Sequence, residues 1–579
     1  MRRLLLAVVF LVLAATVPLA RGATAVPPTT SLQTIGGDPA AAYSRLKLLP
    51  GWKRVVREDL GARAGKRRHF RRRSLLYFAQ LTDFQLADEE SPARAELLDI
   101  AGSPFKSAWR PQEALEPFTV DQVIRQVNRF DASPIRNQRR RRARLALTIT
   151  TGDSADNQQI NETKWVVRLL EGGQLNPNSG VEGSPCALTV PPGEAARYTG
   201  VQDDGDVLES GRFYDPNRPS GAFAAWPSYP GLMDRAQQPF QTPGLKRPSY
   251  VAFGNHDGTV QGNLHAFKVL DDLARGCVKP LAISGLAVPG ALTTSPSRSI
   301  IVPPDPDRGF ADRPTYKALH TTGHQQDAHG FAYVDAAELR ASRGQAAYYS
   351  FSPKPGIRMI AINTVAEGDT INSNGNLDDP QFRWLRRELQ ASEERNELVI
   401  LFGHHPIRSL VNPAPDEDAG PCALRAVFGP GCDLDPRNSK PLHLGGDLRA
   451  LLLANPHVIA YVAGHTHENR VTAFARPGGS GGFWGIETAS EIDWPILSRL
   501  LEVMDNRDRT LSIFGTLIDH GAPHATPPAG TPAFGLDPAT LAALGREFSY
   551  NDPQAGVQDG AEGRLQDRNV ELLVPDPRR

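Results

Sequence analysis

Five short polar motifs in this chain hold side chains that can bind metal ions. Together they supply two carboxylates, one amide and three imidazoles: Asp83, Asp153, Asn255, His404, His465 and His467. This mixture suits Mn²⁺, Fe or Zn²⁺, and it differs from a soft site built of thiolates. A carboxylate can bridge two cations, and two cations about 3.5–4 Å apart can hold a hydroxide and clamp phosphate oxygens. The residue types therefore predict a two-metal site for phosphate-ester chemistry.

Each motif directly follows a short apolar run that predicts a strand. The five predicted strands span residues 74–81, 143–151, 249–253, 398–402 and 458–463. Runs that are apolar on both faces are typical of strands covered on both sides. Segments with helical periodicity alternate with them, at 119–130, 161–170, 379–394 and 446–454. This alternation predicts a layered α/β fold, in which the polar motifs gather at the carboxyl ends of the strands.

The pattern along the chain divides it into four regions. Residues 1–25 have a basic start, an apolar middle and a small-residue end, which predicts a signal peptide and hence export. We expect an N-terminal extension at 26–73 and the main domain at 74–520, with Gly/Pro-rich insertions at about 172–248 and 276–350. Residues 521–579 are polar and rich in Pro and Gly, so we expect a poorly ordered tail. No later stretch reaches 18 apolar residues, so we expect no membrane span in the mature chain.

Composition limits the partners that the protein can have. The 64 basic residues balance 64 acidic ones, so no bulk field favours a nucleic-acid partner. Two local basic runs, at 66–73 and 139–144, predict a solvated edge, with a phosphate-rich surface partner as the alternative. Export would permit disulfides; the preferred pairs are Cys422 with Cys432 and Cys186 with Cys277, although four cysteines allow three connectivities.

Taken in order, the motifs resemble those of the calcineurin-like metallophosphoesterase family. The family pattern is D-x-H, G-D-x-x-D/N, G-N-H-D/E, H-x-P and G-H-x-H. The corresponding segments here are Asp83-Phe84-Gln85, Gly152-Asp153 with Asp156-Asn157, Gly254-Asn255-His256-Asp257, His404-His405-Pro406 and Gly464-His465-Thr466-His467. Four of the five match fully, over a span of about residues 75–520. The resemblance implies an αββα sandwich, which the predicted alternation of strands and helices permits.

The resemblance also implies a role for each matched residue. Asp153 would bridge both metals, and Asp83 and His467 would hold the first one. The second metal would be held by Asn255, His404 and His465. His256 would stabilise the phosphoryl oxygens or protonate the leaving group, and Asp257 would orient His256. Neither Asp156 nor Asn157 is expected to bind metal, and His405 is expected to lie outside the ligand set.

Gln85 departs from the family pattern, because it stands where the family usually has a metal-binding histidine. A glutamine oxygen is a neutral, harder ligand than an imidazole nitrogen. Gln85 could bind the first metal more weakly, bond a metal-bound water, or leave the position to Asp88 or Glu89. The prediction includes Gln85 among the metal ligands.

These inferences predict an exported, metal-dependent phosphoesterase. A hydroxide held by two metals would attack the phosphorus of a phosphate mono- or diester, with no covalent enzyme intermediate. The substrate could be a small molecule or a lipid headgroup, and the metals could be Mn, Fe or Zn. The alternative is a binding module that keeps the fold and has lost catalysis, for which Gln85 is the only support.

Overall fold

Two β-sheets packed face to face form the centre of the protein. The computed structural model describes residues 26–63, 65–101, 106–181, 197–203, 212–282, 298–366, 373–414 and 442–579. One sheet has seven strands in the order β10 (Ser249–Val251), β7 (Leu147–Thr150), β4 (Arg73–Leu81), β21 (Leu497–Asp505), β22 (Thr510–Asp519), β23 (Val570–Pro575) and β3 (Val55–Arg57). The other has six, in the order β13 (Tyr349–Lys354), β14 (Ile357–Ala361), β16 (Leu398–Phe402), β18 (Val458–Ala463), β20 (Gly482–Glu487) and β19 (Arg470–Ala475).

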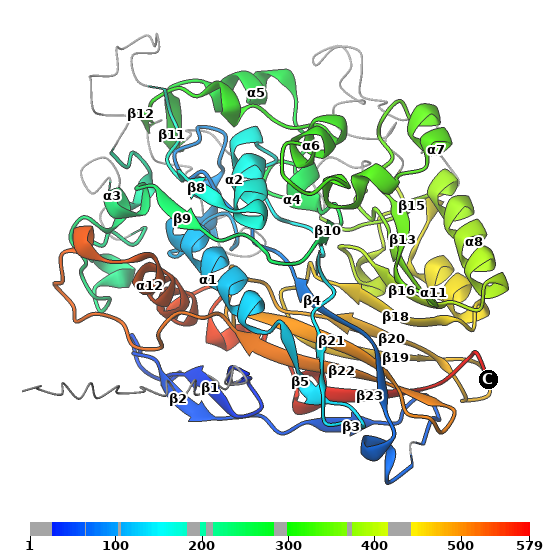
Figure 1. Ribbon diagram of the computed structural model, residues 1–579. Coiled ribbons are helices and arrows are strands. Elements are labelled where there is room, and N and C mark those ends of the chain that lie inside the picture. Colours follow the sequence, from blue (N-terminus) through cyan, green and yellow to red (C-terminus); the bar gives the residue numbers. More distant parts are fainter. Residues whose placement is uncertain are drawn as a thin grey trace, which may run out of the picture.

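Helices cover the outer face of each sheet (Figure 1). On one side lie α1 (Glu116–Arg129), α2 (Ile160–Glu171) and α12 (Pro538–Asn551), and on the other α8 (Asp379–Glu394) and α11 (Gly445–Ala454). The predicted α/β class and layered αββα arrangement are therefore confirmed. The apolar stripe of α1 faces the core, where Val120, Ile124 and Val127 are fully buried, as the helical spacing of these residues predicts.

Shorter elements lie mainly in the loops and insertions. The remaining strands are β1 (Gln33–Gly36), β2 (Lys47–Pro50), β5 (Ala132–Arg136), β6 (Arg142–Arg144), β8 (Gly173–Leu175), β9 (Phe240–Thr242), β11 (Val278–Ala282), β12 (Arg298–Ile301), β15 (Leu377–Asp378) and β17 (Leu442–His443). The remaining helices are α3 (Leu232–Ala236), α4 (Asn255–Gly258), α5 (Lys268–Arg275), α6 (Arg313–His320) and α7 (Ala336–Ala341). The predicted strand 143–151 is shorter than expected because Arg142–Arg144 pairs with β5 instead.

Parallel pairing in both sheets brings the motif-bearing strand ends together. In the seven-stranded sheet β4, β7 and β10 run parallel, and in the six-stranded sheet β16 and β18 do so. Gln80, near the end of β4, links the sheets, because its Nε2 donates to the Ala463 carbonyl at 2.9 Å and its Oε1 accepts from Thr488 Oγ1 at 2.6 Å. The carboxyl ends of strands from both sheets therefore meet at one edge of the sandwich.

The expectation of a poorly ordered tail at 521–579 is wrong. Helix α12 packs against α1 and buries Leu541, Leu544 and Phe548, and Asp537 caps its start by accepting a hydrogen bond from the Thr540 amide. Strand β23 then joins the seven-stranded sheet beside β22. Because the region is rich in Pro and Gly, its composition does not indicate α12 or β23. The expected N-terminal extension also contributes to the sheet, because β3 pairs with β23.

Both insertions are attached to the loop that follows β4 by buried polar contacts. Arg308 Nε lies 2.8 Å from Asp88 Oδ2, and Ser179 Oγ donates to Asp88 Oδ1 at 2.8 Å. Lys279 Nζ lies 2.7 Å from Glu96 Oε2 in the same loop. Buried charges are stable only when they are paired in this way. The loop after β4 therefore anchors the described parts of both insertions.

Two sequence expectations fall wholly or partly outside the described residues. Residues 1–25, with the predicted signal peptide, lie outside the described residues, as do Cys186, Cys422 and Cys432. Cys277 is disulfide-bonded, and the predicted connectivity stays a prediction. Within the described segments, no helix combines the length and the apolar character needed to cross a bilayer.

Removing the Arg308 guanidinium should destabilise the fold. Arg308→Met leaves the buried Asp88 carboxylate without its cation, so the free energy of unfolding should fall by about 3–5 kcal/mol. Lys164→Met is the matched control, because Lys164 pairs with Asp307 at the surface, with side chains 48% and 49% exposed; the loss there should be about 0–1 kcal/mol. Denaturant unfolding measures both. Equal losses would show that the buried pair does not hold the insertion.

Candidate metal centre

The predicted metal ligands lie in tight turns after the strands that deliver them. Five site residues have a left-handed backbone, with φ of 53° at Asp83, 44° at Gln85, 53° at Asp153, 69° at His465 and 52° at His467. Residues with a Cβ rarely adopt this conformation, and such strain persists where the surroundings hold it in place. The turns are braced against each other, because the Asp83 amide donates to the Gly152 carbonyl and the Gln85 amide to the Asp153 carbonyl.

Asp153 lies at the centre of the group. Its Oδ2 is 3.1 Å from His404 Nε2, and its Oδ1 accepts the His256 amide at 2.8 Å. Ligand atoms of Asp83, Asp153 and His404 all lie within 4.8 Å of one another, as do those of His404, His405 and His465. The structure thus brings residues from both sheets into one cluster, and Asp153 has the place expected of a bridging ligand.

The three side chains expected at the second metal each have a ligand atom that a cation could engage. The Nδ1–H of His404 donates to the Thr151 carbonyl at 2.8 Å, which leaves Nε2 as the lone-pair nitrogen, 3.2 Å from His465 Nδ1. Asn255 donates through Nδ2 to the Gly262 carbonyl at 2.9 Å, while its buried Oδ1 has no hydrogen-bond partner among the described residues. A cation would satisfy all three atoms, so this set fits the predicted second metal.

His467 faces Asp83 and Gln85. Its Nδ1–H donates to Asp493 Oδ2 at 2.6 Å, and its Nε2 lies 3.5 Å from Asp83 Oδ1 and 3.3 Å from Gln85 Nε2. The buried Gln85 Oε1 has no partner within the described chain. A carboxylate behind a histidine is the usual support of a metal-binding imidazole. The arrangement fits the predicted first metal, and Gln85 lies beside it.

The charges of the cluster match the need for cations. Burial opposes protonation of His404, yet Asp153 outweighs it and raises the pKa of the ring to about 9. Burial likewise opposes protonation of His467, while Asp493 and Asp83 raise its pKa to about 10. Burial and the neighbouring His405 instead lower the pKa of His465, which keeps that ring neutral. Metal ions would take the place of protons here, as is general for histidine ligands.

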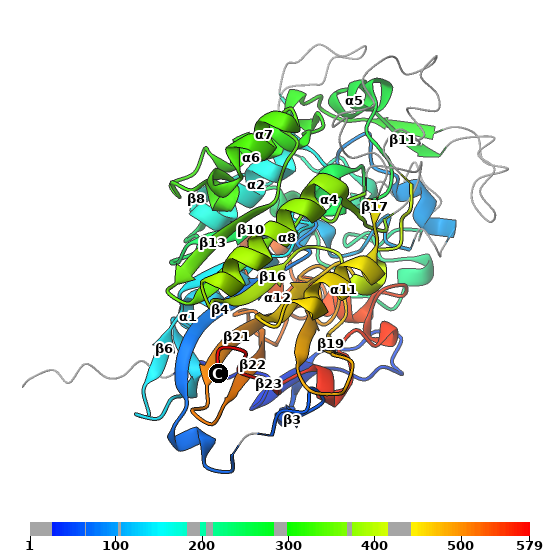
Figure 2. The ribbon, with the colours of Figure 1, turned by 90° about the vertical axis from the view of Figure 1, so that its right-hand side faces the viewer.

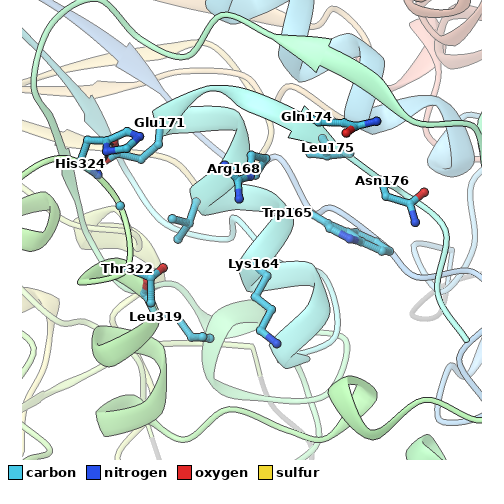
Figure 3. A pocket seen from close by; sticks show the side chains of 12 residues that line it. Lys164, Trp165, Arg168, Glu171, Gln174, Leu175, Asn176, Leu319, Thr322 and His324 are labelled. Carbon is cyan, nitrogen blue, oxygen red and sulfur yellow. Dashed lines mark hydrogen bonds between the residues drawn. The ribbon is translucent and has the colours of Figure 1, made fainter. Parts of the chain in front are cut away.

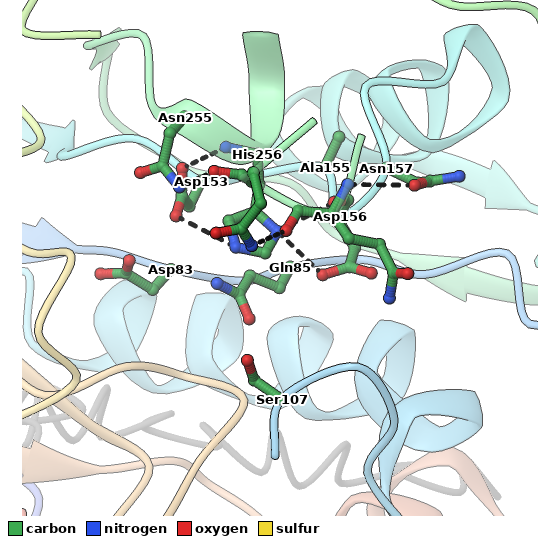
Figure 4. A network of polar contacts seen from close by, with 12 residues as sticks. Asp83, Gln85, Ser107, Asp153, Ala155, Asp156, Asn157, Asn255 and His256 are labelled. Atoms are coloured by element: carbon green, nitrogen blue, oxygen red, sulfur yellow. Dashed lines mark hydrogen bonds and ion pairs between the residues drawn. The ribbon is translucent and has the colours of Figure 1, made fainter. Parts of the chain in front are cut away.

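The residue that holds His256 differs from the expectation (Figure 4). The His256 Nδ1–H donates to the Asp156 carbonyl at 2.9 Å, and Asp156 Oδ1 lies 3.0 Å from the same nitrogen. Asp257 does not orient His256: its carboxylate accepts the amides of Ser154, Ala155 and Gly254. The prediction for Asp257 is therefore wrong, because its carboxylate is engaged by backbone amides of the turns that follow β7 and β10.

Other candidate ligands are already engaged elsewhere. Both ring nitrogens of His405 have partners, Thr364 Oγ1 at 2.9 Å and the Ser373 carbonyl at 2.8 Å, in line with its expected exclusion from the ligand set. Asp88 pairs with Arg308, and Glu89 accepts from Tyr198 Oη at 2.7 Å. Neither acid replaces Gln85.

A buried charge network connects the two histidine supports. Arg94 contacts Asp156 and also donates from Nη2 to Glu113 Oε2 at 2.7 Å. The other Glu113 oxygen lies 3.6 Å from Arg110 Nη1, and Arg110 Nε lies 2.7 Å from Asp493. This chain runs from Asp156, behind His256, to Asp493, behind His467. No sequence motif indicates this network, because Arg94, Arg110 and Glu113 lie outside the five motifs.

A separate cavity of about 550 Å³ lies along the exposed face of α2 (Figure 3). Its lining includes Lys164, Arg168 and Glu171 of α2 together with His324. Glu171 is engaged there, since it accepts the amides of His324 and Gln325. None of the predicted metal ligands lines this cavity.

Comparison with known proteins gives a family match and short local matches to curated proteins, of which three are described here. The family model for calcineurin-like phosphoesterases matches residues 204–469, which include the motifs of Asn255, His404 and His465 but not Asp83 or Asp153. Sphingomyelin phosphodiesterases from Bos taurus and Homo sapiens are each 36% identical over 77 residues, 13% of this chain and 12% of theirs. Sphingomyelin phosphodiesterase 2 from Caenorhabditis elegans is 36% identical over 76 residues, 13% of this chain and 11% of its own.

A solved structure is also similar to the chain. A dimetal phosphatase from Danio rerio aligns with 77% of this chain and 100% of its own, at 12% identity and a TM-score of 0.35. In this chain, the αββα sandwich and the Asp/His cluster at the junction of its two sheets agree with the family match. The family match over residues 204–469 confirms the expected resemblance to the calcineurin-like phosphoesterases.

Exchanging Asp156 and Asp257 one at a time for asparagine should separate their roles. Asp156→Asn removes the charge behind His256, so kcat should fall by roughly 10²-fold with metal content unchanged. Asp257→Asn replaces an acceptor of backbone amides, so the free energy of unfolding should fall by about 1–3 kcal/mol. Turnover, metal analysis and denaturant unfolding give the three readouts. If Asp257→Asn lowered kcat without loss of stability, Asp257 would regain the role implied by the resemblance.

Replacing Gln85 by histidine should tighten metal binding at the predicted first site. The new imidazole would stand beside His467, and one of the two metals should bind about tenfold more tightly, equivalent to about 1.4 kcal/mol; the effect should be clearest for Zn²⁺ or Fe. Metal titrations of the wild type, Gln85→His and Gln85→Ala under identical buffer make the comparison. Equal affinities in all three proteins would place Gln85 outside the metal shell.

Proposed function

We propose that the protein is a metal-dependent hydrolase of phosphate esters. The observation that carries this proposal is the convergence of Asp83, Asp153 and His404, together with two buried oxygens that have no hydrogen-bond partner among the described residues, Asn255 Oδ1 and Gln85 Oε1. Buried polar atoms normally have partners. Two unsatisfied oxygens beside a cluster of carboxylates and imidazoles are what a pair of bound cations would satisfy.

The donor set assigns each side chain a task toward the metals. Asp153 would contact both ions, Asp83, Gln85 and His467 the first, and Asn255, His404 and His465 the second. Bound in this way, two cations would polarise the phosphate oxygens and activate the attacking water. The supports of His404 and His467 fix which ring nitrogen faces the site, so the ligands are oriented before any ion binds.

His256 is the residue placed to act on the substrate. Asp156 holds its Nδ1, which leaves Nε2 directed toward the cluster, 3.9 Å from Asp153 Oδ2. Burial opposes the charged ring, but Asp153 and Asp156 outweigh it and raise the pKa of His256 above its ordinary value. The raised pKa favours the protonated ring, and a protonated imidazole in this place can donate its proton to the leaving oxygen.

Two further observations support the proposed substrate class and location. The similarity to sphingomyelin phosphodiesterases supports a phosphate ester of a lipid headgroup or a small molecule of the same chemistry, and a diester is the first candidate. The basic, apolar and small-residue pattern of residues 1–25 supports export. These signals concern where and on what the protein acts, and they are independent of the metal-centre geometry.

Removing the central carboxylate charge tests the proposal. Asp153→Asn should lose at least one bound metal and about 10²–10³-fold in turnover, with the fold kept. Asp307→Asn, the same change on a half-exposed surface carboxylate, should retain both. Metal content by mass spectrometry and turnover of p-nitrophenyl phosphate, bis-p-nitrophenyl phosphate and sphingomyelin are measured together.

The two readouts discriminate between an enzyme and a binding module. Turnover of any of these esters that chelation abolishes and added metal restores would support the proposal. Two bound metals without turnover of any ester would favour the catalytically inactive module. Full activity of Asp153→Asn with two metals bound would reject the assignment of Asp153.

A further inference from the structure

Two basic segments that are distant in the sequence lie side by side at one end of the sandwich. We call residues 66–73 and 136–144 together the basic pole. The Gln138 amide donates to the Arg72 carbonyl at 3.0 Å, and Arg72 Nε donates to the Arg136 carbonyl at 2.9 Å. Figures 1 and 2 both place the start of β4 and the β5–β6 hairpin at the same extremity of the molecule. The two segments therefore form one surface.

Most of the positive charge of the basic pole is uncompensated. Arg68 pairs with Glu571 and Arg144 with Asp131. The other exposed basic side chains make no ion pair with any described residue: Lys66, Arg67, Arg71, Arg73, Arg136, Arg139, Arg140 and Arg141. The formal net charge of the chain is zero, yet its positive charge is concentrated at one end. The basic pole therefore creates a strong local positive field.

An exposed aromatic ring lies within this field. Phe70 is 63% exposed, and its ring lies tilted by 43° against the ring of His69, with centroids 3.9 Å apart. It projects from the turn between β3 and β4, with arginines on both sides in the sequence. A large apolar ring surrounded by arginines is the combination that favours an interface between water and anionic lipid, where the cations meet headgroups and the ring enters the acyl boundary.

We propose that the basic pole docks the protein on an anionic lipid surface. A bilayer can contact both segments at once, and it offers an apolar layer to Phe70. A nucleic-acid duplex would neutralise the arginines, but its outer surface is a row of phosphates and has no such layer for the ring. The combination of charge and exposed ring therefore favours the bilayer.

Docking in this way would leave the metal centre free. Arg73 is the first residue of β4 and Asp83 follows its last one, so the nine-residue strand separates the basic pole from the metal centre. At about 3.3 Å per residue that distance is roughly 30 Å. A docked molecule would present its site to the solution on the side away from the lipid. The proposal does not rest on the proposed hydrolase activity.

Replacing the hairpin arginines tests the docking surface. The turn is shaped by Asn137 Oδ1, which accepts the amides of Arg139 and Arg141, so the arginine side chains can be changed without loss of the turn. In the full chain, the triple variant Arg139→Gln/Arg140→Gln/Arg141→Gln should bind vesicles of phosphatidylcholine with about one third phosphatidylglycerol ~100-fold more weakly in low salt. Phe70→Ser should weaken binding by about tenfold.

The matched control also removes three positive charges, but from another part of the molecule. Arg383, Arg386 and Arg387 are exposed on α8, far from the basic pole, and their replacement by glutamine should leave vesicle binding unchanged. Vesicle sedimentation measures binding, and metal content shows that each variant keeps its site. Equal losses in both triple variants, equal binding to pure phosphatidylcholine vesicles, or tighter binding to a DNA duplex than to anionic vesicles at the same salt would each overturn the proposal.

Discussion

The arrangement of the candidate site depends on one buried guanidinium, that of Arg94. A charge taken out of water is tolerated only with partners, and Arg94 finds three of them, Asp156, Glu113 and Glu96. Each contact fixes a different part of the molecule: the support of His256, the start of α1, and the loop that receives Lys279 from an insertion. Because these acids would repel one another without the cation, the position of Arg94 determines how the loop after β4 folds over the strand ends.

The metal centre is a property of the packed sandwich rather than of either sheet. Asp83, Asp153 and Asn255 come from the seven-stranded sheet, whereas His404, His465 and His467 come from the other. Neither half offers a complete ligand set, so bound cations would connect the layers. The same junction contains the left-handed turns, whose strain is sustained by the contacts between them. Order in the site and cohesion of the two layers are thus coupled.

Local patterns in the sequence were sufficient for the layers and for the clustering of the predicted ligands, because each ligand follows its own apolar strand. They failed where the partner is distant in sequence. Asp493 and Arg110, which support His467, belong to no motif. The family resemblance implied for Asp257 the role that Asp156 has in the structure. Strand β21 and the elements of residues 521–579 were missed, since their burial depends on neighbours that local composition does not reveal.

The edge of the larger sheet joins residues from opposite ends of the described chain. Among the described strands, β3 pairs only with β23, and Val55 lies opposite Val570, more than five hundred positions away. Contacts across such a separation close late, after the intervening chain has largely folded. During synthesis, residues 55–57 would leave the ribosome long before their partner strand exists. The sheet can then be completed only after residue 575 has emerged, so a ribosome-bound chain would hold an open, unpaired edge until β23 has been made.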